Sequence, residues 1–205
     1  MSSRATKCDS PGGARKSLGI GSDHYVYGLS PEERTNIALY LNFDMIGSPN
    51  FIYAVYDGDG SSFGLSGPPG SEAIEELFQS FYADRGLPSE PAGISFRSDY
   101  AAFFTVGIPF GGLFTGAEGI KTPGQVALYG GVAGEQYDPC YHLACDTYDN
   151  ISLEALDVNS DAVATAVLQY AMSTESVNGK RGKGNFGVQS APPPGPPAPT
   201  GAATR

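Results

Sequence analysis

A nearly continuous apolar run at residues 37–43 restricts most strongly the folds that are open to this chain. Strands of a parallel sheet that are covered on both faces have this composition, whereas half-exposed strands alternate apolar and polar residues. Asp44 ends the run and Gly47 follows it. We therefore expect a strand buried on both faces that carries a carboxylate at its C-terminal end, where ligands bind in open α/β sheets.

The rest of the chain alternates between predicted strands and helices. Residues 51–56 are a second predicted strand, residues 94–97 a short extended piece, and residues 107–116 a glycine-rich strand. Apolar residues at helical spacing predict an amphipathic helix over residues 71–85, and the last helix is expected over residues 153–172. This alternation favours an α/β layer fold with a mostly parallel sheet, and an antiparallel sandwich is the structural alternative.

Shorter signals add local detail. Residues 30–33 read Ser-Pro-Glu-Glu, which is typical of a capped helix start. Residues 23–28 are the expected end of another helix, in which His24 packs against the core, and Asp99 is expected to cap a helical turn. The inner face of the last helix is expected to comprise Leu156, Val163, Ala166, Val167 and Tyr170.

Length and charge limit the classes of function. A chain of 205 residues is long enough for one domain, and its formal net charge of −10 argues against nucleic acid as a partner. No apolar window reaches the length of a membrane span, so no membrane partner is expected. We expect an unpatterned or disordered start at residues 1–17, a domain at residues 18–176, and a disordered Pro/Gly-rich tail at residues 177–205.

A lone histidine, His142, lies between two of the three cysteines. If Cys140 and Cys145 pair, the short loop would fix the direction of the imidazole, and Cys8 would be left over. Against this, a single histidine is more often an ordinary surface or core residue. A disulfide and the glycosylation triplet at residues 150–152 would suit a secreted protein, although no signal peptide is expected at residues 1–8, which contain no apolar run.

Four chemically different side chains lie near the ends of predicted strands. They are the carboxylate of Asp44, the guanidinium of Arg97, the phenol of Tyr141 and the imidazole of His142. The chain has no phosphate-binding Gly-Lys-Ser/Thr loop, and its Gly-x-Ser-x-Gly match at residues 60–64 lies within a predicted Gly/Ser-rich loop at residues 58–70 and not at a strand-to-helix turn, which weakens serine hydrolase and phosphotransfer readings. The set is typical of a metallohydrolase, with Asp and His on zinc, Tyr at the oxyanion and Arg orienting a charged end of the substrate.

These residues lie in four motifs that resemble a known family. The motifs are YLNFDMIGS at residues 40–48, RSDY at 97–100, GGLFTG at 111–116 and CYH at 140–142. The chain is similar to the C-terminal half of the co-catalytic zinc aminopeptidases of the secreted Streptomyces leucyl aminopeptidase type, metallopeptidase family twenty-eight. The resemblance runs from about residue 18 to residue 172. It implies a three-layer fold, incomplete at the N-terminus, with a mostly parallel central sheet flanked by helices.

The resemblance also implies two zinc ions, a peptide substrate, secretion of the complete protein and a role for each residue. Asp44 matches a ligand of one zinc that faces the free amine of the substrate, and His142 matches a ligand of the other zinc. Tyr141 matches the catalytic tyrosine that stabilises the tetrahedral intermediate, and Arg97 an arginine near the substrate terminus. The walls of an apolar pocket for the first side chain match Met45 and Phe114.

One segment departs from the family pattern. Where the family has Gly-Ala-Glu-Glu, with a zinc ligand and the general base, residues 13–16 read Gly-Ala-Arg-Lys. Basic side chains oppose a metal cation, so we expect half a metal site and weak or absent activity. A truncated or misread gene product would explain the change.

Two other functions stay open. One is a non-catalytic remnant or pseudo-enzyme that binds peptides through the retained pocket. The other is glutaminyl cyclase-like chemistry, which the adjacent Tyr141 and His142, together with Met45, disfavour.

Overall fold

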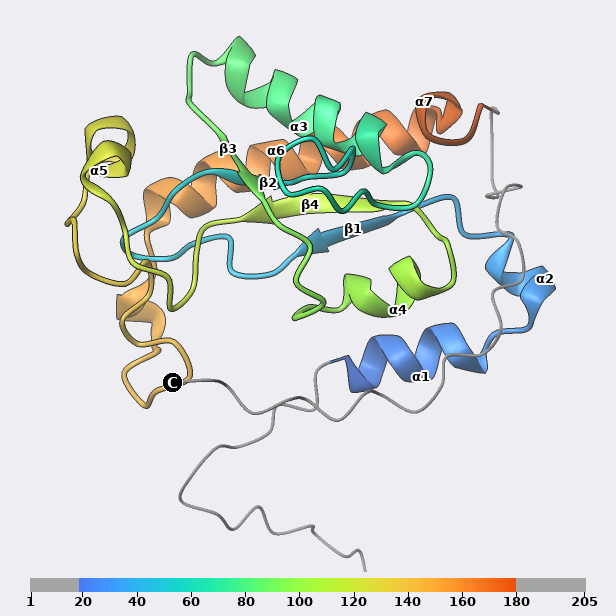
Figure 1. The fold of residues 1–205 in the computed structure, drawn as a ribbon, viewed down its shortest axis with the longest axis horizontal. Helices are drawn as coiled ribbons and strands as arrows, with labels where there is room; N and C mark the ends of the chain where they lie inside the picture. Colours follow the sequence, from blue (N-terminus) through green and yellow to red (C-terminus); the bar gives the residue numbers. More distant parts are fainter. Residues whose placement is uncertain (1–18, 180–205) are drawn as a thin grey trace, which may run out of the picture.

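Four short strands form one sheet in the computed structural model, which describes residues 19–179 (Figure 1). The sheet has the order β1-β4-β2-β3. β1 pairs with β4 in parallel, as does β2 with β3, and only the central pair of β2 and β4 is antiparallel. The mostly parallel sheet is confirmed, and the antiparallel sandwich is wrong. The strands are β1 (Tyr40–Phe43), β2 (Ala54–Tyr56), β3 (Glu90–Ala92) and β4 (Phe110–Phe114).

Helices cover both faces of the sheet and make three layers. In Figure 1, α3 and α6 lie above the sheet, and α4 and α1 lie below it. Contacts of α3 with β4 and α6, and of α4 with β1 and α1, agree with this arrangement. The helices are α1 (Ile20–Gly28), α2 (Pro31–Arg34), α3 (Ser71–Asp84), α4 (Tyr100–Thr105), α5 (Pro123–Tyr129), η1 (Tyr148–Asn150), α6 (Leu153–Met172) and α7 (Glu175–Asn178).

The core lies on both sides of the sheet because residues 51–56 alternate between its faces. Phe51, Tyr53 and Val55 belong to the apolar cluster formed with α3 and α6. Their neighbours Ile52, Ala54 and Tyr56 belong to the cluster on the α4 side. All six side chains are buried, as the predicted second strand requires, although regular strand geometry is limited to the last three.

β1 corrects the prediction of a strand buried on both faces. It starts at Tyr40, and within the described residues it is an edge strand with β4 as its one neighbour. Only Asn42 is buried, at 2% exposure, while the other three residues are half-buried. Leu41 and Phe43 still pack against the cluster on the α3 side. The apolar run therefore predicted a strand correctly, but its position in the sheet is a tertiary property that the run does not specify.

Three local predictions are also wrong. The extended piece predicted at residues 94–97 is interrupted at Phe96, whose φ of 59° is left-handed, and it forms no strand. His24 is exposed on α1 and does not pack against the core. Asp99 occupies the N-cap position of α4 without a capping hydrogen bond, and its carboxylate accepts a hydrogen bond of 2.9 Å from Ser22 Oγ.

The long helices agree well with their predicted bounds. α3 begins at Ser71 and ends one residue before the predicted end, and α6 covers the predicted residues. The capped start at residues 30–33 is confirmed by a reciprocal capping box in α2. The predicted inner face of α6 is wrong in part, because Val167 is 53% exposed. The buried face of α6 consists of Ala155, Asn159, Ala162, Ala166 and Tyr170.

The ends of the packed region differ slightly from the expected boundaries. α7 follows α6 and reaches Asn178, and its Val177 is buried against the α3 cluster, so the fold extends beyond residue 176. The expected disordered start at residues 1–17, the Gly-Ala-Arg-Lys segment within it and most of the expected tail lie outside the described residues. Among the helices of residues 19–179, none has both the length and the apolar character needed to cross a membrane.

Close pairing of β1 with β4 depends on Gly112. A Cβ atom at this position would collide with the backbone carbonyl of Asn42 on β1. We expect Gly112→Ala to lower the free energy of unfolding by about 1–3 kcal/mol, since overpacking forces the backbone to shift. Gly28→Ala is the control, because a Cβ there meets nothing within 4 Å. Urea unfolding measures both variants, and equal midpoints would show that the strands do not need this close approach.

Candidate metal and substrate site

Asp44 and Phe114 lie at the same edge of the sheet because β1 and β4 are parallel and in register. The chain turns directly after β1, where Met45 has a left-handed φ of 55°. Its carbonyl accepts a hydrogen bond of 2.8 Å from the amide of Thr115, which follows β4. Such backbone strain in a residue other than glycine often accompanies functional sites. The two strand ends are thus fixed to each other beside the predicted site.

A chain of hydrogen bonds orients the Asp44 carboxylate. Ser98 Oγ lies 2.8 Å from Asp44 Oδ2 and donates a hydrogen bond to it. The buried Asn42 in turn donates a hydrogen bond of 3.0 Å from Nδ2 to Ser98 Oγ. The same nitrogen donates to the Tyr56 hydroxyl at 3.3 Å. Burial raises the pKa of Tyr56 well above its ordinary value, so the phenol stays protonated. Asp44 itself is exposed, so its orientation comes from these partners and not from close packing.

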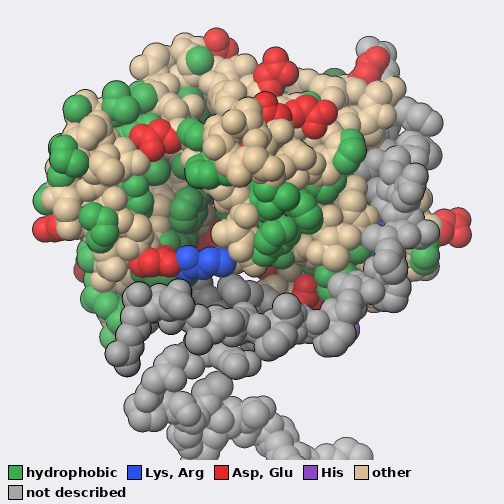
Figure 2. All heavy atoms as spheres, in the orientation of Figure 1, with side chains coloured by type: hydrophobic (Ala, Val, Ile, Leu, Met, Phe, Trp, Pro, Cys, Tyr) green, Lys and Arg blue, Asp and Glu red, His purple; other side chains and the backbone are tan. Residues whose placement is uncertain are grey.

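An apolar cavity of about 370 Å³ opens beside Asp44. Figure 2 shows a hollow on this face of the molecule, with basic and acidic side chains adjacent at its lower edge. Apolar side chains from β2, β3 and the segment before β2 form much of its wall, namely Ile52, Ala54 and Ala92. The cavity brings together five of the residues singled out from the sequence, which are Asp44, Met45, Arg97, Phe114 and Tyr141.

Arg97 forms an ion pair at the mouth of the cavity. Its Nη1 atom lies 2.5 Å from Oε1 of Glu118, and both side chains are partly exposed. Hydrogen bonds to Glu118 first, and also to Tyr141, raise the pKa of Arg97 above its ordinary value. Sequence reasoning assigned Arg97 to a charged end of the substrate, and it did not single out Glu118. The spacing of Glu118 from Arg97 along the chain gives no sign of this contact.

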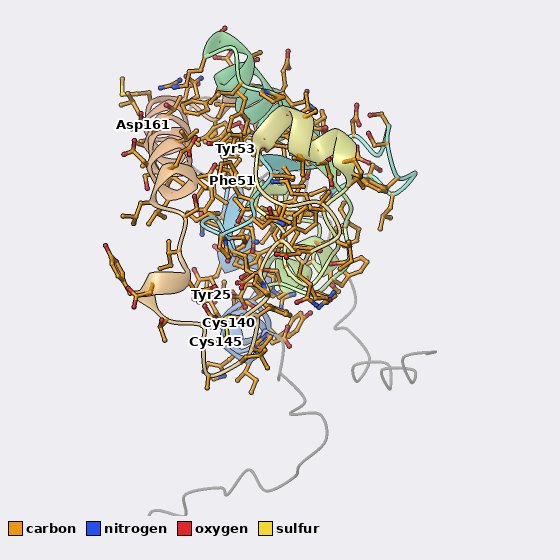
Figure 3. All side chains as sticks on the ribbon, turned by 90° about the vertical axis from the view of Figure 1, so that its left-hand side faces the viewer. Tyr25, Phe51, Tyr53, Cys140, Cys145 and Asp161 are labelled. Atoms are coloured by element: carbon orange, nitrogen blue, oxygen red, sulfur yellow. A yellow bond between two sulfur atoms is a disulfide. The ribbon has the colours of Figure 1, made fainter. Side chains whose placement is uncertain are left out.

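Tyr141 and His142 lie in a loop closed by a disulfide. Cys140 and Cys145, labelled in Figure 3, form a disulfide. Their Cα atoms are 5.3 Å apart. The loop is anchored at its start by the buried Asp138, whose Oδ1 accepts a hydrogen bond of 2.9 Å from the amide of Cys140. His142 has a left-handed φ of 61°. The predicted pairing is present, and the disulfide restrains a strained turn.

His142 lies beside the cavity, not in its wall. Its ring centre is 4.1 Å from that of Tyr141, which does line the cavity, and the imidazole is exposed. His142 is thus next to the cavity through its contact with Tyr141, which lines the cavity together with Asp44. No group of three or more potential metal ligands in residues 19–179 includes Asp44 or His142. Since catalytic zinc sites typically have three protein ligands, the described residues fit only part of such a site.

Three carboxylates elsewhere are close enough to share an ion, namely those of Asp57, Asp59 and Glu75. All three already accept backbone hydrogen bonds that hold the loop after β2, and Asp59 Oδ1 accepts from the amide of Ser61 at 2.7 Å. Glu75 Oε2 accepts from the amide of Gly58 at 2.8 Å, and Asp57 Oδ2 accepts from the amide of Phe63 at 2.8 Å. These hydrogen bonds give the carboxylates a structural role, because they stabilise the conformation of the loop.

Comparison with known proteins identifies the family of the chain. The family model described as Peptidase family M28 matches residues 17–167. The chain belongs to peptidase family M28. It is 57% identical over 166 residues to an "Aminopeptidase" of Pseudomonas aeruginosa, a match that covers 81% of this chain and 31% of the relative. It is 48% identical over 178 residues to "Leucine aminopeptidase 2" of Trichophyton rubrum, covering 86% of this chain and 36% of that protein.

Solved structures give the same result for the fold of this M28 chain. A zinc aminopeptidase from Bacillus subtilis superimposes with a TM-score of 0.56 at 25% sequence identity, covering 77% of this chain and 34% of that one. The chain thus spans about a third of the length of the relatives that it matches. The resemblance stated from the four sequence motifs is confirmed, and with it the metallo-aminopeptidase family and the association of that family with zinc.

Proposed function

We propose that this chain is part of a zinc-dependent aminopeptidase that hydrolyses apolar N-terminal residues from peptides. The observation that carries the proposal is an apolar cavity with a carboxylate, Asp44, at its mouth. An N-terminal residue presents an apolar side chain and a positively charged amine on the same carbon atom. A pocket with an anion at its entrance matches both groups, and membership of family M28 supplies the reaction class.

Each of the residues from the sequence then has a role in this proposal. Met45 and Phe114 contact the first side chain of the substrate, and Asp44 accepts a hydrogen bond from its amine. Tyr141 and Arg97 supply hydrogen-bond donors at the opening, where an oxyanion would form. Asp44 and His142 would be ligands of zinc, which when bound polarises the carbonyl and activates water.

The metal centre needs ligands beyond those two, so we derive no step through zinc from this chain alone. The two-ion centre expected from the sequence stays a prediction. Secretion of the complete protein also stays a proposal. The disulfide between Cys140 and Cys145 supports it, because disulfides persist mainly in oxidising compartments.

Zinc stoichiometry and turnover of leucine p-nitroanilide test the function. We expect the 205-residue chain to bind less zinc than the two ions of a full centre and to hydrolyse the substrate weakly or not at all. Rapid, zinc-dependent release of leucine by the isolated chain would contradict this expectation. A chain that neither binds zinc nor recognises free-amine leucine derivatives would contradict the proposed function itself.

A peptide-binding module without catalysis is the second candidate. The observation in its favour is that Asp44 and His142 join no group of three ligands within residues 19–179. This candidate predicts leucinamide binding that is independent of zinc, together with no turnover at any zinc concentration. The proposed enzyme instead predicts that added zinc tightens binding, because Asp44 lines the cavity and His142 lies against Tyr141, which also lines it.

A further inference from the structure

Three charged side chains line the apolar cavity, and Glu118 determines their net charge. They are Asp44, Arg97 and Glu118. Arg97 and Glu118 pair with each other at 2.5 Å, so the positive charge nearest the opening is already matched. The formal sum of the three charges is −1, and Asp44 carries the unmatched charge. In the chain without bound zinc, a substrate therefore meets a site that attracts its amine and offers no uncompensated side-chain cation to an acidic residue.

We propose that Glu118 is a specificity-determining residue which cancels the charge of Arg97 and so keeps the site from selecting peptides with an acidic residue after the first one. The proposal rests on the proposed aminopeptidase function. The expected substrates are peptides with an apolar first residue and an uncharged second residue. Arg97 then acts as a hydrogen-bond donor fixed between Glu118 and Tyr141, not as a receptor for a carboxylate.

The geometry supports this division of roles. Glu118 lies in the loop after β4, while Arg97 precedes α4, so the ion pair joins two segments at the cavity mouth. Arg97 also bonds to Tyr141 of the disulfide loop. A guanidinium held between two partners loses little additional conformational freedom when it donates to the substrate. Its side chain is 54% exposed and that of Glu118 is 42% exposed, so substrate and solvent ions can both reach the pair.

Removing the Glu118 charge should leave Arg97 free to attract acid groups. The probes are leucyl-aspartate amide and leucyl-asparagine amide, which differ by one charge at nearly constant size. Their dissociation constants are measured by NMR titration of the full chain in EDTA, where zinc-dependent cleavage is blocked. We expect Glu118→Gln to shift the ratio of the two constants toward the aspartate peptide by about two- to fivefold, as for a partly exposed ion pair.

Three controls separate the charge effect from other causes. Glu118→Asp keeps the charge and should stay near the wild-type ratio. Glu76→Gln removes an exposed charge on α3, outside the cavity wall, and should change nothing. Raising the salt to 0.5 M should abolish most of the shift in Glu118→Gln, because exposed charges are screened.

The outcomes distinguish this inference from the proposed function. An unchanged ratio in Glu118→Gln overturns the inference, even though both peptides bind. A wild-type chain that already favours the aspartate peptide overturns it as well. If neither peptide binds the wild-type chain, in EDTA or with zinc added, the proposed function fails, and the selectivity that rests on it fails too.

Discussion

Replacing Phe78 by alanine should lower the free energy of unfolding by about 3–5 kcal/mol, the largest loss of stability that we expect from a single change. Phe78 lies on α3 with 0% exposure, inside the cluster shared by α3, α6 and the sheet. Its ring meets that of Phe43 on β1 edge to face, with centres 6.1 Å apart. The variant removes the contact that supports the strand from which Asp44 projects.

Urea or thermal unfolding measures this loss. Typical domains are stable by about 5–15 kcal/mol, so the variant could be substantially unfolded at 37 °C. Ser80→Ala is the matched control on the same helix, since its side chain is exposed and the change should stay within about 0.5 kcal/mol. A loss below about 1.5 kcal/mol for Phe78→Ala would mean that the α3 layer contributes far less than its burial indicates.

Asp44→Asn should weaken leucinamide binding by about tenfold or more. The substitution keeps the shape of the side chain and its contact with Ser98, but it removes the negative charge that would receive the amine. Hydrogen bonds to charged groups contribute about 1.5–3 kcal/mol, and each 1.4 kcal/mol corresponds to a factor of ten. NMR titration or calorimetry on the full chain gives the two affinities.

Asp99→Asn is the control for the Asp44 variant. It removes one negative charge from an exposed residue that is close to Arg97 in sequence. The Asp99 carboxylate contacts Ser22, and Asp99 does not line the cavity. Its affinity for leucinamide should change less than twofold. Equal losses in both variants would indicate a general effect of net charge, and the assignment of Asp44 to the amine would then be wrong.

Sequence reasoning predicted the elements better than their positions in the sheet. The bounds of α3 and α6 followed from apolar periodicity, and the capping box fixed the start of α2. By contrast, the same apolar run that predicted β1 gave a wrong degree of burial, because burial depends on which strand lies alongside. β3 was missed since it is a three-residue strand that contains Pro91 at the edge of the sheet.

The site shows a similar limit. The sequence motifs singled out five residues that line one cavity in the structure, namely Asp44, Met45, Arg97, Phe114 and Tyr141. They did not predict that Ser98 orients Asp44 or that Glu118 pairs with Arg97. Those contacts join residues that no periodic pattern relates, and they depend on the path of two loops. The role of His142 as a zinc ligand stays a prediction, and its imidazole lies against Tyr141 but outside the cavity wall.

The central claim is that this cavity receives an apolar N-terminal residue whose free amine contacts Asp44. NMR titration of the full chain with leucinamide and with N-acetyl-leucinamide tests it most directly, because acetylation converts the charged amine into a neutral amide and leaves the leucine side chain unchanged. We predict that leucinamide shifts the signals of Met45 and Phe114 and binds at least about tenfold more tightly than the acetylated compound. Equal affinities, or shifts confined to residues away from the cavity, would contradict the account.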